Sequence, residues 1–150
     1  MIGAISEWSV HPWILGNVGR WMSFYNYTLK SFGIDTMIML GNCPVSYEHS
    51  IPEIVYENYL DLTTALEAHP NTNIVALCAD GTHSPVDLGS YTHPAEDVLY
   101  IVGSDYGEVN HTVLDNFNNV DHVNIEGTLT QPLWGHVALA IAFWDRKRKG

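Results

Sequence analysis

The chain has 150 residues, 46% of them hydrophobic, and a formal net charge of −11 at pH 7. This length suits one domain, so we expect a single domain over residues 1–150, and the apolar content excludes an intrinsically disordered protein. Four of the six basic residues form the terminal run Arg146–Lys149, so residues 1–145 carry two bases against 17 acids. Such a body repels phosphate, and a nucleic acid would have to be held by Arg20, Lys30 and the terminal run.

No apolar run approaches the roughly 18 residues of a membrane span, and the first residues lack the basic flank of a secretory signal. We therefore expect a cytoplasmic protein that has no membrane partner. Cys43 and Cys78 are the only cysteines and lie far apart in the sequence, which predicts two buried thiols and no disulfide framework. The eight histidines show no pair at the i, i+4 spacing of a helical metal site, so we expect no metal.

The N-terminal third of the chain predicts a strand, a helix and a second strand. Residues 3–10 alternate weakly and end at a His-Pro break. Apolar residues recur at three- and four-residue spacing over Asn17–Phe32, which predicts a helix that Asn17 caps and Gly33 ends. The continuous apolar run Thr36–Leu40 is typical of a strand that is buried on both faces.

The rest of the chain continues this alternation. Residues 53–70 predict a helix that extends to His69, with room for a break near Asn58, and Pro70 ends it. The further expected elements are strands at 73–79, 98–104 and 120–125, a short helix within 108–117, a final helix at 133–149, and a polar connection at 80–97 that holds little more than a turn or a short strand. Alternating strands and helices with buried strands indicate an α/β protein with a mostly parallel sheet, which binds ligands at the carboxyl ends of its strands.

Three glycine-bearing junctions follow or adjoin predicted strands: GNVGR at 16–20, GSDYG at 103–107 and EGTLTQP at 126–132. Turns of this kind bring backbone amides and carbonyls close to a ligand. None contains the Gly-Lys-Ser or Gly-Lys-Thr of a phosphate loop or the three-glycine spacing of a dinucleotide-binding turn. The junctions therefore argue against ATP and NAD as ligands.

The order of these pieces resembles the SPOUT superfamily, and in particular its SpoU-like branch of S-adenosylmethionine-dependent RNA 2′-O-ribose methyltransferases. The resemblance covers nearly the whole chain and rests on HPWILGNVGRW, on Phe32-Gly33, on NIVALCADG, on LYIVGSDYG and on VNIEGTLTQPLWGHVALAIAFWD. Two motifs depart from the family pattern. Asp105 stands where the second motif usually has Glu. In the third motif, Ile125-Glu126 and Pro132-Leu133-Trp134 stand where Ile-Pro and Ser-Leu-Asn are common.

The resemblance implies an α/β domain with helices on both faces of the sheet and a C-terminal deep trefoil knot, which forms a homodimer and binds S-adenosylmethionine. It implies that backbone groups hold the adenine, and it assigns the cofactor to Leu77, Cys78, Gly103, Asp105, Ile125 and Leu133. We add that the Asp105 carboxylate would favour the positive sulfonium of the cofactor. The resemblance also names Arg20 as catalytic and Asn17 as its neighbour at the ribose.

Arg20 has two interpretations from the residues alone. Arginine is always protonated, so it would orient a phosphate or stabilise a developing alkoxide, and would not act as a base. The other interpretation is an arginine on the helix surface that pairs with one of the 17 carboxylates. Because the body is almost empty of arginine, we favour the functional role.

The final helix also leaves alternatives open. The run Arg146–Lys149 complements the helix dipole, aids solubility or contacts RNA. His136 takes the place of a family serine toward substrate, or it is packed or exposed, which we favour. The apolar positions Val137, Ile141 and Trp144 belong to the core or, in a dimer, partly to an interface.

From these observations we expect a cytoplasmic, homodimeric RNA methyltransferase that modifies a ribose 2′-hydroxyl of tRNA or rRNA. A second interpretation is a knotted S-adenosylmethionine-binding protein that has lost catalysis and serves as a binding module. A third is a methyltransferase for a small non-RNA substrate, which would suit the acidic body.

Overall fold

The computed structural model describes residues 1–8, 18–41, 43, 49–78, 85–103, 109–125 and 133–150. Within this part of the chain, seven strands form one sheet in the order β3-β2-β1-β6-β4-β7-β5, and every strand pair is parallel. The strands are β1 (Ile2–Glu7), β2 (Thr36–Leu40), β3 (Val55–Tyr59), β4 (Asn73–Cys78), β5 (Val86–Asp87), β6 (Val98–Ile101) and β7 (Val120–Asn124). The predicted parallel sheet is confirmed.

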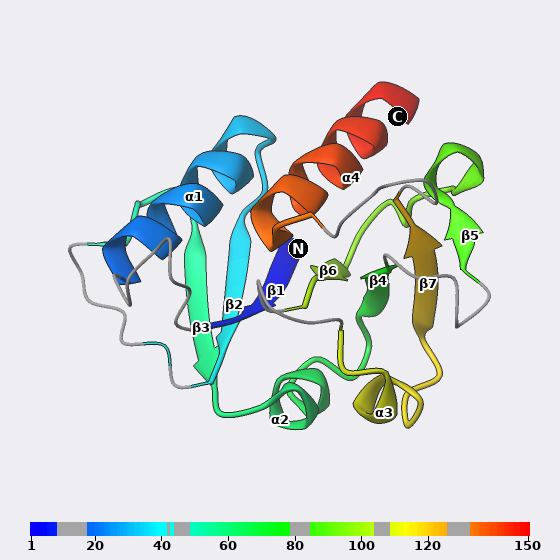
Figure 1. Ribbon diagram of the computed structural model, residues 1–150, viewed down its shortest axis with the longest axis horizontal. Coiled ribbons are helices and arrows are strands. Elements are labelled where there is room, and N and C mark those ends of the chain that lie inside the picture. The colour runs from blue at the N-terminus through cyan, green and yellow to red at the C-terminus, as the bar shows by residue number, and fades with distance from the viewer. Residues whose placement is uncertain (9–17, 42, 44–48, 79–84, 104–108, 126–132) are drawn as a thin grey trace.

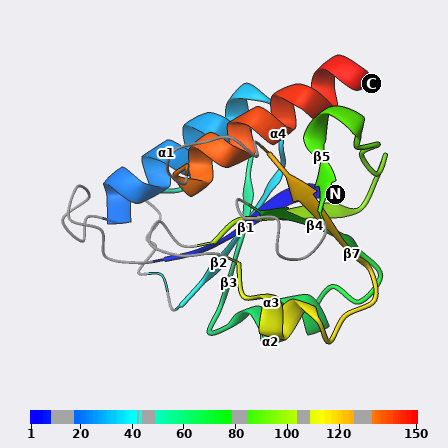
Figure 2. The ribbon, with the colours of Figure 1, turned by 45° about the vertical axis from the view of Figure 1, so that its right-hand side comes forward.

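Helices cover both faces of the sheet (Figures 1 and 2). The long helices α1 (Val18–Ser31) and α4 (Gly135–Lys149) lie side by side on one face, and the short helices α2 (Leu62–Glu67) and α3 (His111–Leu114) lie on the other. This arrangement confirms the predicted α/β class with helices on both faces. The predicted trefoil knot depends on residues 126–132, which lie outside the described part of the chain, and it stays a prediction.

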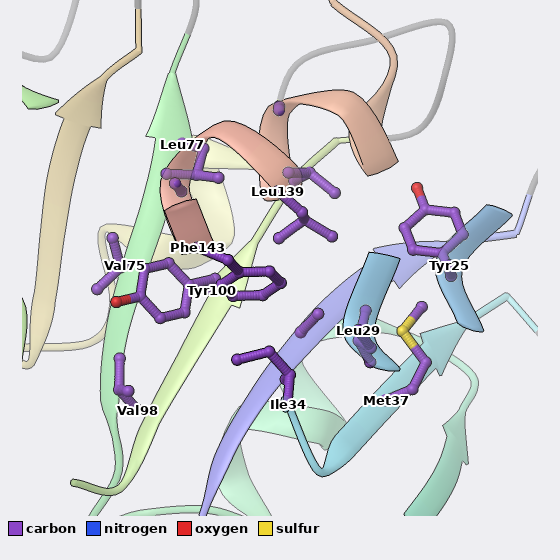
Figure 3. Close-up of a cluster of buried hydrophobic side chains, with 14 of the residues drawn as sticks. Tyr25, Leu29, Ile34, Met37, Val75, Leu77, Val98, Tyr100, Leu139 and Phe143 are labelled. Carbon is purple, nitrogen blue, oxygen red and sulfur yellow. The ribbon is translucent and has the colours of Figure 1, made fainter. Parts of the chain in front are cut away.

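The two faces of the sheet carry two separate hydrophobic cores. The first core lies between the sheet and helices α1 and α4, and it includes Leu29 of α1, Phe143 of α4 and the strand residue Tyr100, which lies next to Phe143 (Figure 3). The rings of Tyr100 and Phe143 meet edge to face, with their centroids 5.2 Å apart. The second core lies under α2 and α3. Full burial of each large side chain contributes about 1.5–3 kcal/mol, so these cores hold the layers together.

The expected helix over residues 53–70 is wrong in its first half. Residues Val55–Tyr59 form strand β3, which pairs in parallel with β2 at one edge of the sheet. The stretch contains Val55 and two tyrosines, residue types that favour strands. It therefore pairs with the backbone of β2 and does not form a helix. The helix begins only after Asp61, whose side chain accepts a hydrogen bond of 2.9 Å from the amide of Thr64.

The other predicted elements are confirmed, with bounds that agree within three residues at each end. The first strand ends at Glu7, before the expected end. Helix α1 ends at Ser31, and Gly33 follows with φ of +68°, the left-handed conformation that ends a helix. The polar connection contains β5 and a 3-10 turn at Leu88–Ser90. Asn17, the expected cap of α1, lies outside the described residues.

Both cysteines are buried free thiols, as the sequence predicts. Burial raises the pKa of Cys43 to about 12. Among the described residues, no helix is long and apolar enough to span a bilayer.

Candidate functional site at the carboxyl ends of three strands

Three neighbouring strands, β6, β4 and β7, bring most of the predicted cofactor residues to the carboxyl edge of the sheet, the edge at which the parallel strands end. Strand β4 pairs with β6 through Ala76 and Ile101, and with β7 through Cys78 and Asn124. Leu77 and Cys78 therefore end β4 beside Gly103, which lies two residues beyond β6, and beside Ile125, which follows β7 directly. Backbone amide and carbonyl groups beyond the last paired residues of a strand are not used in the sheet, so they can bind a ligand.

The first turn of α4 closes against the same edge. A Cβ atom added to Gly135 would lie 2.5 Å from the Tyr25 hydroxyl, 2.9 Å from a methyl group of Val102 and 3.6 Å from the carbonyl oxygen of Gly103. Only a glycine lets α4 begin this close to the end of β6. Leu133 lies two residues earlier and packs, with Ile125, partly buried against the first core.

Tyr25 ties three elements together at this edge. Its hydroxyl lies 2.7 Å from the Oγ atom of Ser6, and both side chains are buried. Ser6 comes from the end of β1, Tyr25 comes from α1, and Gly135 lies directly over the Tyr25 hydroxyl. This contact fixes the start of α4 relative to α1 and the sheet.

A half-buried aromatic cluster lies where α1 meets the start of α4. The rings of Phe24 and His136 stack with their centroids 4.8 Å apart and an interplanar angle of 20°. Trp134 completes the cluster, with centroids 6.4 Å from Phe24 and 5.8 Å from His136. His136 is thus packed, the interpretation that we favour from the sequence. The aromatic surface suits stacking against a flat ring.

Arg20 lies exposed on the first turn of α1. It precedes Phe24 by four residues, a spacing that places both side chains on one face of the helix. Arg20 therefore lies at the end of α1 from which Phe24 meets the start of α4. Whether Arg20 contacts substrate or pairs on the surface stays a prediction. The other predicted residues, Asn17 and Asp105, lie outside the described residues.

The terminal bases are used mostly for structure. Arg146 donates hydrogen bonds to the carbonyl oxygens of Pro94 and Ala95 and to the Tyr100 hydroxyl. Lys149 donates to the carbonyl oxygens of Leu88 and Tyr91, at 2.6 and 2.9 Å. These contacts hold the segment between β5 and β6 against α4.

Asp145 is the centre of this network, and the sequence analysis missed it. Its carboxylate, 3% exposed, forms ion pairs with Arg148 at 2.8 Å and Lys149 at 2.7 Å. The spacing of Arg148 and Lys149 at i+3 and i+4 from Asp145 in the expected final helix could have predicted these ion pairs. Burial raises the pKa of Asp145, but hydrogen bonds from Lys149, His93 and Arg148 outweigh burial and lower the pKa below its usual value.

His93 lies at the other side of Asp145. Its Nε2 atom is 2.8 Å from Asp145, and its Nδ1 atom is 2.7 Å from the Tyr100 hydroxyl. Burial lowers the pKa of His93, and the charges of Lys149 and Arg146 act in the same direction, against Asp145. Asp145 already has two cationic partners, so it gains little from a third, and we take His93 as neutral.

A groove of about 730 Å³ lies next to this network, between the start of β1 and the ends of α1 and α4. Ile2, Gly33, His93 and Arg146 are among its lining residues. Because it opens at the amino ends of the strands, it is not part of the site at the carboxyl ends.

Solved structures share this fold. A TrmH-family protein from Porphyromonas gingivalis matches with a TM-score of 0.71 and 14% identity, over 99% of this chain and 60% of that one. The SpoU methyltransferase AviRb from Streptomyces viridochromogenes, solved in complex with AdoMet, matches with a TM-score of 0.66 and 14% identity, over 98% and 59%. A structure described for the 2-OH methylation of C/U34 on tRNA matches with a TM-score of 0.66 and 18% identity, over 99% and 95%.

The chain thus spans about three fifths of the length of the first two neighbours. No protein-family profile and no curated protein sequence matches it. The structural neighbours, the parallel sheet and the converging strand ends agree with the motif order, and the chain therefore has the fold of the SpoU and TrmH methyltransferases.

Proposed function

We propose that this chain is an S-adenosylmethionine-dependent RNA methyltransferase that transfers a methyl group to a ribose 2′-hydroxyl of tRNA. The observation that carries the proposal is the convergence of Leu77, Gly103, Ile125 and the start of α4 at one edge of a SpoU-type sheet. The structural neighbours that are named as methyltransferases, one of them in complex with AdoMet, support the same chemistry.

The residues at this edge fit the cofactor. Ile125 and Leu133 provide half-buried apolar surface that suits an adenine ring, and backbone groups of Leu77, Gly103, Ile125 and Leu133 would hold its polar edge. Cys78 adjoins Leu77 through the backbone, and Asp105 would face the sulfonium. The close approach that Gly135 permits between α4 and Gly103 would narrow the site around a bent ligand.

Bound S-adenosylmethionine would supply an electrophilic methyl group, and the protein's main task would be positioning. Arg20 would hold the phosphate next to the target ribose or stabilise the alkoxide that develops at its 2′-oxygen, with Asn17 beside it. Phe24 and Trp134 would offer an aromatic surface to a base of the RNA. Arg20 stays protonated throughout, so the proton of the hydroxyl group leaves by another acceptor.

We also propose that the chain is a cytoplasmic homodimer that associates through α4. Val137, Ile141 and Trp144 form an apolar stripe at i, i+4 and i+7, and they are 37%, 36% and 58% exposed. A second subunit would bury this stripe. We expect Ile141→Glu to convert a dimer in analytical ultracentrifugation into a folded monomer, while the exposed control Thr63→Glu leaves the dimer intact. A monomeric unmodified chain at micromolar concentration would refute the dimer.

The acidic body favours a second candidate, a methyltransferase for a less anionic substrate. Three of the four terminal bases are engaged within the chain, and Lys30 lies 3.6 Å from Glu53, so few cations are left for phosphate. The third candidate, a binding module without catalysis, follows from Pro132-Leu133-Trp134 at the third motif.

Two measurements separate these candidates. Calorimetric titration with S-adenosylmethionine and with its demethylated product should show one site per chain, and the absence of heat and of any thermal shift at millimolar ligand would refute the cofactor. Transfer of labelled methyl into unmodified bulk tRNA should follow. Cofactor binding without transfer to any RNA points to the binding module, and transfer to small acceptors alone points to the second candidate.

A further inference from the structure

Strands β4 and β7 and helix α3 bring two histidines and a cysteine together on the second-core face of the sheet. The candidate ligand atoms of Cys78, His111 and His122 all lie within 4.8 Å of one another. The Cys78 sulfur lies 3.7 Å from Nδ1 of His122, and the two imidazole rings have centroids 5.3 Å apart. These residues are far apart in the sequence, so the expectation of no metal, which rested on i, i+4 spacing, misses them.

The fold explains why these side chains meet. Side chains alternate between the faces of a strand, and Ala76 and Cys78 both point into the second core. His122 is the ladder partner of Ala76, so it emerges on the same face, next to Cys78. His111 is the first residue of α3, which covers this face of the sheet (Figure 2).

A fourth polar group lies on the same face. Asn124 is the ladder partner of Cys78 and lies two residues after His122, so it shares their side of β7. Its Oδ1 atom is buried and has no hydrogen-bond partner within the described part of the chain. A buried amide oxygen without a partner is uncommon and calls for a ligand, an ion or a water.

We propose that Cys78, His111 and His122 bind a transition-metal ion, with Zn²⁺ as the preferred ion and a fourth position open to Asn124 or water. Thiolate and imidazole are the usual ligands of Zn²⁺. With Zn–S of about 2.3 Å and Zn–N of about 2.05 Å, tetrahedral geometry separates sulfur and nitrogen by about 3.6 Å, close to the observed Cys78–His122 distance. Because the ligand atoms lie within 4.8 Å of one another, binding would shorten the remaining distances by about 1.5 Å at most.

The two proposed sites share Cys78 but lie on opposite faces of the sheet, because the metal would use its side chain and only its backbone adjoins the cofactor. Ile125 and Leu133 pack against the first core, whereas Cys78 belongs to the second core on the opposite face of the sheet. A bound ion would cross-link the ends of β4 and β7 to the start of α3. Because loops of the proposed cofactor site follow both strands, the ion would also hold the carboxyl edge in place.

The test uses the untagged chain in a phosphine reductant, with Zn²⁺ alone as the probe. Equilibrium dialysis should give one zinc per chain, and zinc should raise the melting temperature. Co²⁺ should show a thiolate charge-transfer band and the strong visible bands of a four-coordinate ion. Cys78→Ser and His122→Gln should each weaken zinc binding by more than about 100-fold, since loss of an outer-shell partner alone costs 10- to 100-fold.

Cys43→Ser is the matched control, because it removes the other buried thiol, in the first core. It should keep full zinc binding and the cobalt spectrum. His122→Gln keeps the test decisive should Cys78→Ser fail to fold. The proposal is overturned by a chain that binds no zinc, by zinc binding that survives both ligand variants, or by a cobalt complex without a thiolate band.

Discussion

The two ends of the sheet differ in how far their buried polar groups find hydrogen-bond partners. At the amino end, His93, Tyr100 and Asp145 are linked by hydrogen bonds of 2.7 and 2.8 Å, and the bases of α4 complete the network. At the carboxyl end, the buried Nε1 of Trp21 and Oδ1 of Asn124 have no hydrogen-bond partner among the described residues. A network whose members satisfy one another's hydrogen bonds stabilises the fold, whereas buried polar groups without a hydrogen-bond partner are typical of a site that binds a ligand, an ion or a water.

This difference changes the meaning of the charges in the sequence. The terminal run of four bases looks like an anion-binding tail, but most of it fastens the segment between β5 and β6 to α4. Arg20, the only arginine before this run, lies exposed on the first turn of α1 at the other end of the sheet. The number of charges in a segment therefore says less about function than the number of acceptors that the fold places around them.

The largest effect is expected at the amino end, from Asp145→Ala. The substitution leaves His93 buried without its carboxylate partner and removes the anion that Arg148 and Lys149 share. We expect the free energy of unfolding to fall by about 3 kcal/mol, because buried His93 loses its charge-assisted hydrogen bond and two part-exposed cations lose their anion. Urea unfolding followed by circular dichroism measures it.

The matched control is Asp87→Ala, because Asp87 is exposed. We expect it to change the free energy of unfolding by about 0.5 kcal/mol or less. Equal losses for the two variants would show that the amino end is not the stabilising network that its geometry indicates.

The next largest effect is expected at the carboxyl end, from Arg20→Ala. If Arg20 acts on the transition state, methyl transfer to tRNA should fall by about 100-fold or more, with cofactor affinity and melting temperature nearly unchanged. Arg20→Lys should restore only part of the activity, because an ammonium group lacks the planar fork of arginine. Single-turnover methylation is the readout.

Lys30→Ala is the charge-matched control on the same helix, since Lys30 lies near Glu53 at the far end of α1. Its effect on single-turnover rate should be within a few fold, because it removes the same charge farther from the site. A melting temperature that falls by many degrees in Arg20→Ala, with unchanged activity per folded molecule, would assign Arg20 to a surface ion pair instead.

How far the sequence predicts this molecule depends on how local each signal is. The apolar run Thr36–Leu40 and the periodic apolar residues of α1 indicate by their spacing which residues are buried. The strand and the helix can therefore be predicted from the local sequence. Strand β3 was missed because its pairing with β2 is a tertiary event that helical spacing conceals. The order of motifs predicted which strand ends would meet, but the grouping of Cys78, His111 and His122 needs the ladder register and the position of α3.

The smallest effect concerns the pH dependence of the amino end. Burial lowers the pKa of His93 below its ordinary value of 6.5 in the folded protein. Between the lowered pKa and 6.5 the unfolded chain binds more protons, so stability is full above about pH 6.5 and falls as the pH is lowered through this window. The slope from this one group cannot exceed about 1.4 kcal/mol per pH unit.

The other histidines also titrate in this range, so the informative quantity is the difference between the unmodified chain and His93→Gln. Glutamine keeps a donor and an acceptor near Tyr100 and Asp145 but cannot take up a proton. Urea unfolding from pH 5 to pH 8 should show a free energy of unfolding that depends less on pH in His93→Gln than in the unmodified chain. The two curves should be closest at low pH, where the unmodified chain has lost the stability that neutral His93 contributes. Parallel curves would mean that His93 binds its proton equally in both states, and the closed network at the amino end would then be insensitive to pH.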